Sequence, residues 1–331
     1  MNQKLVTHEN NRNSIQQKMK YKIQIIGAGV WGCALALNYI RAGNQIILKT
    51  KKDIDFLQIK KFFSNFCVTT YNDKFLKNNF QNENFIKISE ECEKNIDFTI
   101  FAVDSKNLER ALDEYLDSRS NSDVIIATKG MHHEKVQLFS SYFYDKSINP
   151  SIISGPTFAN ELAQGEKSSA IIASNDLNHA KDIAGKLSTN HLTLHPSDDV
   201  IGTQICGIYK NICAIAFGYL EGKNSSNNFK AKILVESTQE LSFILTRFGG
   251  MQETAISYAG LGDIVLSCYS SNSRNFRYGK LIAEKGAKQA SIEFTECKEG
   301  VDSTYSLAKL CRAFYKHLNI LPWVYELISD E

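Results

Sequence analysis

KIQIIGAGVWGCALALNYIRAGNQIILKT, residues 22–50, predicts how the first half of the chain folds. The apolar run KIQII predicts a strand, and the run after the glycines predicts a helix that ends at Gly43. Between them Gly27, Gly29 and Gly32 follow the pattern G-x-G-x-x-G, which permits a tight turn, close backbone approach to a pyrophosphate and close helix packing. The stretch therefore predicts a dinucleotide site. The alternative is a glycine-rich helix start that binds nothing.

The alternation of strand and helix continues for about 150 residues. Further buried strands are predicted at 44–50, 96–103, 123–130, 169–174 and 191–195, and SIISGPTFANELAQG (151–165) predicts a strand, a loop and a helix. Other helices are predicted at 53–66, 106–117 and 176–188. Continuous apolar strands alternating with helices predict an α/β fold, a doubly wound parallel sheet of the Rossmann type.

The strand pattern stops after Pro196, and the rest of the chain predicts a second, all-helical domain. Helices are expected at 198–220, 229–248, 251–258, 263–270, 274–285 and 302–318. We therefore predict a polar N-terminal tail at 1–20, a dinucleotide-binding domain at 21–196 and a helical substrate and catalytic domain at 197–331. The tail has no apolar core, so it does not resemble a signal peptide.

Composition excludes several classes of function. The net charge of the 331 residues is +2, and no stripe of lysine and arginine is present, so we expect no nucleic-acid partner. No run approaches about 18 apolar residues, so we expect no membrane insertion. The eight cysteines form no C-x-x-C pair and are typical of a reducing cytosol, and the histidines and carboxylates form no metal cluster. We predict a cytoplasmic protein without a metal.

The end of the second strand bears on the choice of cofactor. An NAD site would carry Asp or Glu about 20 residues after the glycines, but this chain has Lys49, Thr50, Lys51 and Lys52 there. Ammonium groups favour a 2′-phosphate, so Lys51 is a predicted contact of NADP(H). Asp53 is close enough to keep NAD(H) open as the alternative.

A second informative stretch is GLGDIVLSCYSSNSRNFRYGK, residues 260–280. Asp263 and Ser267 are four residues apart and share one helix face. Ser273, Arg274 and Asn275 open the next helix, where a hydroxyl, a guanidinium and free N–H groups can bind a small phosphate monoester. A capped surface turn is the alternative.

Two lysines are candidates for the chemistry. Lys129 follows a parallel strand, at the edge of the sheet where such folds bind ligands. Lys210 lies inside the apolar helix predicted at 198–220; if it faces a cleft, burial and a second ammonium would lower its pKa toward neutrality. A solvated strand-end lysine and a lysine at the edge of the core are the alternatives.

In order along the chain, these motifs resemble the bacterial-type NAD(P)-dependent sn-glycerol-3-phosphate dehydrogenases. The likeness runs from about residue 22 to 325. It rests on GAGVWGCALA, Asn72 with Phe75 and Leu76, ATKG (127–130), SGPTFANELA (154–163), KNICAIAFG (210–218), GLGDIVLSC with SRNFRYG, and KEGV (298–301). The resemblance implies interconversion of sn-glycerol 3-phosphate and dihydroxyacetone phosphate by hydride transfer at C2, which supplies glycerol 3-phosphate for phospholipid synthesis.

The resemblance also implies roles for individual residues. Lys210 would carry the proton, with Lys129 and Asp263 as further catalytic groups. The implied substrate contacts are Lys129, Gly155, Thr157, Lys210, Asp263, Ser273, Arg274 and Asn275. The implied cofactor contacts, beside the three glycines, are Val30, Trp31, Lys129, Ala159, Arg274 and Glu299.

Some positions depart from the family pattern. Lys77 and Asp104 stand where the family commonly has proline, and Val235, Glu236 and Ser237 stand where it has Thr-Arg-Gly. Two other functions remain open at this point: a related dehydrogenase of the 6-phosphogluconate or 3-hydroxyacid type, and a non-catalytic nucleotide-binding relative. A homodimer is also left open.

Overall fold

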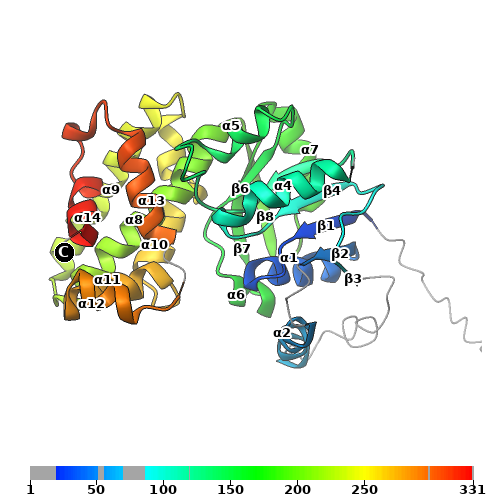
Figure 1. The fold of residues 1–331 in the computed structure, drawn as a ribbon, viewed down its shortest axis with the longest axis horizontal. Coiled ribbons are helices and arrows are strands. Elements are labelled where there is room, and N and C mark those ends of the chain that lie inside the picture. Colours follow the sequence, from blue (N-terminus) through cyan, green and yellow to red (C-terminus); the bar gives the residue numbers. More distant parts are fainter. Residues whose placement is uncertain (1–19, 51–55, 70–85, 119, 297–298, 330–331) are drawn as a thin grey trace, which may run out of the picture.

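The computed structural model describes residues 20–50, 56–69, 86–118, 120–296 and 299–329. A β-sheet flanked by helices forms one half of the molecule and a bundle of helices forms the other (Figure 1). The predicted α/β fold with a second, helical part is confirmed. The predicted domain boundary after Pro196 falls inside the last strand of the sheet.

The sheet has eight strands within the described residues. They are β1 (Lys22–Ile26), β2 (Gln45–Lys49), β3 (Ile86–Ser89), β4 (Phe98–Phe101), β5 (Asp123–Ile126), β6 (Ser151–Ser154), β7 (Ser168–Ala173) and β8 (Leu192–Ser197). Their order is β3-β2-β1-β4-β5-β6-β7-β8. The chain builds outward from β1 on one side and then returns to its other side with β4. This reversal is the topological switch point at which doubly wound folds bind their ligands.

The sheet differs from the prediction in two ways. The strand β3 was not predicted, and β7 runs antiparallel to β6, so β7 and β8 oppose the direction of the other strands. The helix between β6 and β7 is α6 (Ala159–Gln164), whose six residues span about 9 Å. That is too short to return the chain along the roughly 20 Å of β7, so the strand starts at the edge where β6 ended.

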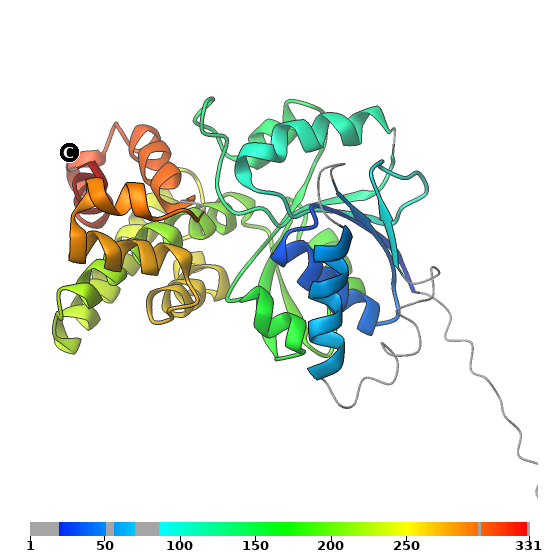
Figure 2. The ribbon, with the colours of Figure 1, turned by 60° about the horizontal axis from the view of Figure 1, so that its bottom comes forward.

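Helices cover both faces of the sheet (Figure 2). One face packs against α1 (Val30–Arg41), α2 (Phe56–Thr69), α6 and α7 (Leu177–Leu187). The other face packs against α4 (Leu108–Asp117), α5 (Phe139–Tyr144) and part of the helical half. The short 3₁₀ helix η1 (Ser105–Asn107) precedes α4.

The helical half is built around α8 (Val200–Gly222), most of whose side chains are buried. Around it lie α9 (Asn227–Arg247), η2 (Gln252–Ile256), the π-helix η3 (Tyr258–Gly262), α10 (Asp263–Cys268), α11 (Arg274–Lys285), α12 (Ala287–Glu293), α13 (Glu299–Leu310), η4 (Tyr315–His317) and α14 (Ile320–Ser329). The helix predicted at 302–318 is interrupted, because α13 ends at Leu310. The helices α5, α12 and α14 were not predicted.

The helix α8 is long and apolar enough to cross a membrane by length and composition, contrary to the prediction that no run approaches that length. In the structure, 89 % of its most apolar window is buried inside the protein. Its hydropathy is therefore explained by its central place in the helical half.

A buried carboxylate fixes the last helix against this centre. Glu240 of α9 accepts hydrogen bonds from the backbone N–H groups of Asn319, Ile320 and Leu321, at 2.5, 2.7 and 2.8 Å. Tyr209 of α8 donates its hydroxyl to the same carboxylate at 2.9 Å. Glu240 thus supplies from another helix the N-terminal cap that α14 needs.

We predict that Glu240→Ala lowers the free energy of unfolding by about 3 kcal/mol, because several buried donors lose their acceptor. Urea denaturation followed by circular dichroism measures this. The control is Glu236→Ala on the same helix, whose carboxylate pairs with Lys232 near the surface. It should change stability by less than about 0.5 kcal/mol. Equal effects of the two variants would contradict the capping role.

Candidate active site

The glycine turn joins β1 to α1 at the switch point of the sheet. Gly27 has φ of +115°, and a Cβ there would lie 2.4 Å from the carbonyl oxygen of Ala102. A Cβ on Gly32 would lie 1.9 Å from the carbonyl oxygen of Gly27. These two positions therefore require glycine for the turn itself.

Gly29 has a different reason to be glycine. It is exposed, and a Cβ there would meet no protein atom within 4 Å. It is also the N-cap of α1, with no side-chain cap and no acidic residue in the first turn. An open cradle beside free helical N–H groups suits a pyrophosphate, so this turn fits the diphosphate of a dinucleotide.

The neighbouring predicted cofactor contacts lie on the same elements. Val30 opens α1 and is 55 % exposed, while Trp31 packs partly against the core. Ala159 is the first residue of α6, which packs on α1. Lys51, with Lys52 and Asp53, lies outside the described residues.

The end of β2 corrects the expectation that Lys49 is among the lysines available to a 2′-phosphate. Lys49 is buried and forms an ion pair with Glu114 of α4. Its ammonium group is therefore neutralised inside the protein and is not available to a 2′-phosphate. Of the predicted lysine group, only Lys51 and Lys52 remain as candidates for that contact.

The structure brings Lys129, Lys210 and Asp263 together from three separate elements. Lys129 follows β5, and its ammonium group bonds the Asp263 carboxylate and the carbonyl oxygen of Gly155, the latter at 3.2 Å. Lys210 of α8 lies with its Nζ 3.9 Å from the other Asp263 oxygen. Thr157 is close by, because its hydroxyl donates to the same Gly155 carbonyl at 3.2 Å.

Ser267 completes this group, although the sequence analysis predicts only that it shares a helix face with Asp263 and assigns it no role. The Lys210 ammonium donates to the Ser267 hydroxyl at 3.2 Å, and that hydroxyl lies 3.4 Å from Asp263 Oδ1. The four-residue spacing within α10 was the available signal. We name Lys129, Lys210, Asp263 and Ser267 the lysine cluster.

Burial shapes the electrostatics of the cluster. Desolvation lowers the pKa of Lys210 from its ordinary 10.5 to about 8. The Asp263 carboxylate opposes this change, while the Lys129 ammonium adds to it. Lys210 can therefore exchange a proton near neutral pH, which an ordinary lysine cannot do effectively.

The predicted phosphate cradle lies at the start of α11, where Ser273 and Asn275 form hydrogen bonds within the protein and Arg274 lies in ion-pair range of Glu299. The Ser273 hydroxyl caps the helix by accepting from Phe276 N–H at 3.3 Å. The Asn275 side-chain oxygen accepts from Gly300 N–H at 3.0 Å. The side chain of Arg274 is 44 % exposed and only 3.7 Å from the Glu299 carboxylate. Arg274 is thus the cation at this helix start that can reach a phosphate.

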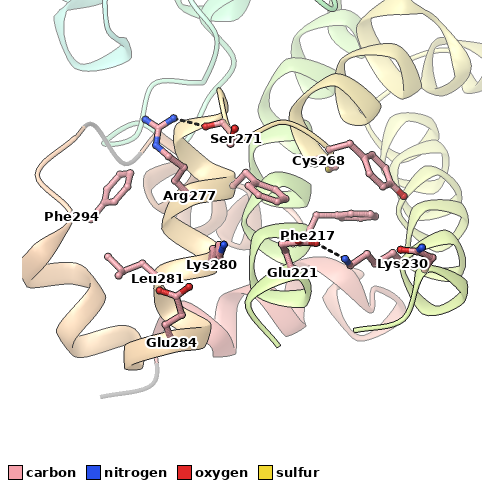
Figure 3. Close-up of a pocket in the computed structure, with 13 residues that line it drawn as sticks. Phe217, Glu221, Lys230, Cys268, Ser271, Arg277, Lys280, Leu281, Glu284 and Phe294 are labelled. Carbon is pink, nitrogen blue, oxygen red and sulfur yellow. Dashed lines mark hydrogen bonds and ion pairs between the residues drawn. The ribbon is translucent and has the colours of Figure 1, made fainter. Parts of the chain in front are cut away.

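A separate cavity of about 800 Å³ lies in the helical half (Figure 3). None of the lysine cluster lines it. Its charged lining residues include Lys230, paired with Glu221, and Arg277, which donates to the Ser271 carbonyl at 2.7 Å and pairs with Glu296. This cavity is therefore separate from the lysine cluster.

Known proteins with the same organisation identify the family. The N-terminal part of NAD-dependent glycerol-3-phosphate dehydrogenase matches residues 22–180, and its C-terminal part matches residues 199–331. A glycerol-3-phosphate dehydrogenase [NAD(P)+] of Wigglesworthia glossinidia brevipalpis is 30 % identical over 321 residues, covering 93 % of this chain and 94 % of that protein. The chain belongs to the NAD-dependent glycerol-3-phosphate dehydrogenase family.

Other relatives agree. The enzyme of the same name from Clostridium botulinum (strain Eklund 17B / Type B) is 29 % identical over 304 residues, covering 89 % of this chain and 87 % of the relative. The crystal structure of glycerol-3-phosphate dehydrogenase from Coxiella burnetii superimposes with a TM-score of 0.76 at 26 % identity, covering 94 % of this chain and 95 % of that one. These matches support an NAD(P)-dependent oxidoreductase of the glycerol-3-phosphate dehydrogenase family, and not a dehydrogenase of the 6-phosphogluconate or 3-hydroxyacid type.

We predict that Gly29→Ala weakens binding of NADPH and NADH at least tenfold while the free energy of unfolding changes by less than about 1 kcal/mol. The added methyl group meets no protein atom but fills the cradle. Titration of intrinsic fluorescence measures the affinity.

The matched control is Gly185→Ala in α7, whose Cβ also meets nothing within 4 Å. It should leave affinity for both cofactors unchanged. Unaltered affinity in Gly29→Ala would show that the diphosphate does not approach this turn.

Proposed function

We propose that the lysine cluster is the catalytic centre and that Lys210 carries the proton. The reaction is dihydroxyacetone phosphate + NAD(P)H + H⁺ ⇌ sn-glycerol 3-phosphate + NAD(P)⁺. The observation that carries the proposal is a buried lysine with a pKa of about 8 beside a second ammonium and a shared carboxylate. Such a group matches the proton transfer that interconversion of a ketone and a secondary alcohol requires.

Each residue of the cluster has a separate task. In reduction, Lys210 donates its proton to the C2 oxygen; in oxidation, neutral Lys210 accepts it. Lys129 stabilises negative charge developing on that oxygen. Asp263 orients the two ammonium groups, and Ser267 restrains the Lys210 amine by its hydrogen bond. The cofactor, when bound, exchanges a hydride with C2.

The phosphate belongs at the start of α11. Arg274 binds it through charge-assisted hydrogen bonds, with the N–H groups of that helix as further donors. Ser273 and Asn275 shape the helix start through their protein contacts. Gly155 and Thr157 line the approach to Lys129. Anchoring the phosphate sets the reach of C2.

Glu299 lies beside Arg274 and contributes to the cofactor side, with Val30, Trp31 and Ala159 on the elements around the glycine turn. Both NADPH and NADH serve as cofactors, with a modest preference for NADPH through Lys51. The protein works in the cytoplasm, supplies glycerol 3-phosphate for phospholipid synthesis, and forms a homodimer.

The function is tested by adding dihydroxyacetone phosphate to the protein with NADPH or NADH and following absorbance of the reduced nicotinamide. Oxidation that depends on the substrate supports the reaction. Failure of both cofactors to react would refute it.

We predict that the pH profile reports Lys210. The kcat/KM for reduction falls as pH rises through about 8, because the protonated amine is the reactive form. The kcat/KM for oxidation rises through the same range, because the neutral amine is then needed. Parallel profiles in the two directions would contradict this assignment.

Lys210→Ala should lower kcat at least about 100-fold while NAD(P)H binding survives. The control is Lys288→Ala, an exposed residue of α12, which should leave kcat unchanged. Near-wild-type turnover of Lys210→Ala would show that another group carries the proton.

We predict that Arg274→Ala raises the KM for dihydroxyacetone phosphate by about 30-fold, equivalent to about 2 kcal/mol of lost charge-assisted binding. Dihydroxyacetone without the phosphate should be a poor substrate for both proteins. Arg312→Ala, at an exposed arginine of the helical half, is the control. If Arg274→Ala leaves KM unchanged, the phosphate binds elsewhere.

A further inference from the structure

His133 connects the two halves of the molecule. Its Nε2 lies 3.3 Å from the hydroxyl of Ser105 in η1, beside the sheet. Its Nδ1 lies 2.8 Å from the hydroxyl of Ser306 in α13, in the helical half. Both ring nitrogens are thus used, one toward each half.

The ring at this position is neutral near pH 7. Desolvation lowers the pKa of His133 below its ordinary 6.5, and the neighbouring groups that also affect this pKa are Asp302, Lys106 and His132. Asp302 raises this pKa, whereas Lys106 and His132 lower it. A neutral imidazole donates from one nitrogen and accepts at the other, and each serine hydroxyl can rotate to match.

The surrounding contacts define the same junction. Lys106 of η1 forms an ion pair with Asp302 of α13 at 3.0 Å, one turn from Ser306. Gly130, with φ of +117°, brings the loop against Ser105, where a Cβ would lie 3.3 Å from the serine Cβ. The loop that carries His133 therefore passes between η1 and α13 at close range.

Both ends of this bridge lead to the catalytic centre. His133 is four residues after Lys129 in one loop. The first two residues of α13 are Glu299, beside Arg274, and Gly300, whose N–H bonds Asn275. A shift of α13 would therefore move the phosphate-binding end of α11 relative to Lys129.

We propose that His133 is a positioning residue. It holds α13 in place, and through α13 it fixes the position of Arg274 at the start of α11 relative to Lys129. The inference rests on the proposed function. The effect on catalysis depends on the substrate. A substrate with a phosphate needs the correct position of Arg274 relative to Lys129, and a substrate without a phosphate does not.

The test compares kcat/KM for dihydroxyacetone phosphate with kcat/KM for dihydroxyacetone. In His133→Ala and in Ser306→Ala the ratio of the two should fall about tenfold, because both variants lose the hydrogen bond between His133 and Ser306 that holds α13. A purely structural defect would lower both values together and leave the ratio unchanged. His133→Gln, whose amide can donate and accept, should restore most of the ratio.

Two further variants sharpen the result. Ser303 lies on the same helix, and its buried hydroxyl has no hydrogen-bond partner among the described residues, so Ser303→Ala should keep the wild-type ratio. The double variant His133→Ala/Ser306→Ala should be no worse than His133→Ala alone, because both changes break one bridge. A ratio within twofold of wild type in His133→Ala overturns the proposal, as does an equal loss in Ser303→Ala.

Hydrogen exchange of the ligand-free protein separates this inference from the proposed function. His133→Ala and Ser306→Ala should speed exchange in the first turn of α13 and at Gly300, while Ser303→Ala should not. This readout needs no substrate. If wild type fails to reduce dihydroxyacetone phosphate, the proposed function falls, and the exchange rates still decide whether the bridge holds α13. Unchanged exchange rates in His133→Ala and Ser306→Ala would overturn the inference that the bridge holds α13.

Discussion

The buried carboxylate of Asp263 is the constraint on which the catalytic arrangement depends. It is 1 % exposed, and an ionised carboxylate at that depth requires cationic partners. One partner, Lys129, comes from the end of a strand, and the other, Lys210, comes from the central helix of the other half. The ion pair with Lys129 therefore joins the two halves of the molecule at the proposed catalytic centre.

The same arrangement explains how a lysine with altered acidity is tolerated. Desolvation alone would favour loss of the Lys210 proton, while Asp263 favours keeping it. The balance leaves the amine neither permanently charged nor permanently neutral near physiological pH. Ser267 adds a polar contact that is compatible with both protonation states, because a hydroxyl can accept from the ammonium or donate to the amine.

The glycine turn and several site residues could be predicted from the sequence, because they depend on local patterns. The apolar run before Gly27 and the helical spacing after it are sufficient to predict β1, α1 and the turn between them. Asp263 and Arg274 were predicted as site residues from short motifs and from the family resemblance that these motifs carry. Their positions beside Lys129, Lys210 and Glu299 could not be predicted from local patterns, because these residues come from other elements of the fold.

The features that escaped prediction depend on contacts between distant segments. The reversed direction of β7 follows from the length of α6, and the start of α14 depends on Glu240, about 80 residues earlier. The burial of Lys49 in β2 could not be inferred because its partner Glu114 lies on α4, 65 residues later in the chain. The contact between His133 and Ser306 could not be predicted, since nothing near His133 in sequence indicates Ser306. For Lys49, for the start of α14 and for His133, a charge or a hydrogen-bonding group finds its partner only through tertiary packing.

The buried helix α8 has a consequence for synthesis of the protein. Most of the helices that cover it, α9 to α14, follow it in the chain, so roughly a hundred residues must be made before its cover is complete. At about 5 to 20 residues per second, this interval lasts roughly 5 to 20 seconds. During that time the nascent chain presents a segment with the length and hydropathy of a membrane span. The helix that carries Lys210 is therefore an exposed apolar segment during translation until the residues that follow it have folded over it.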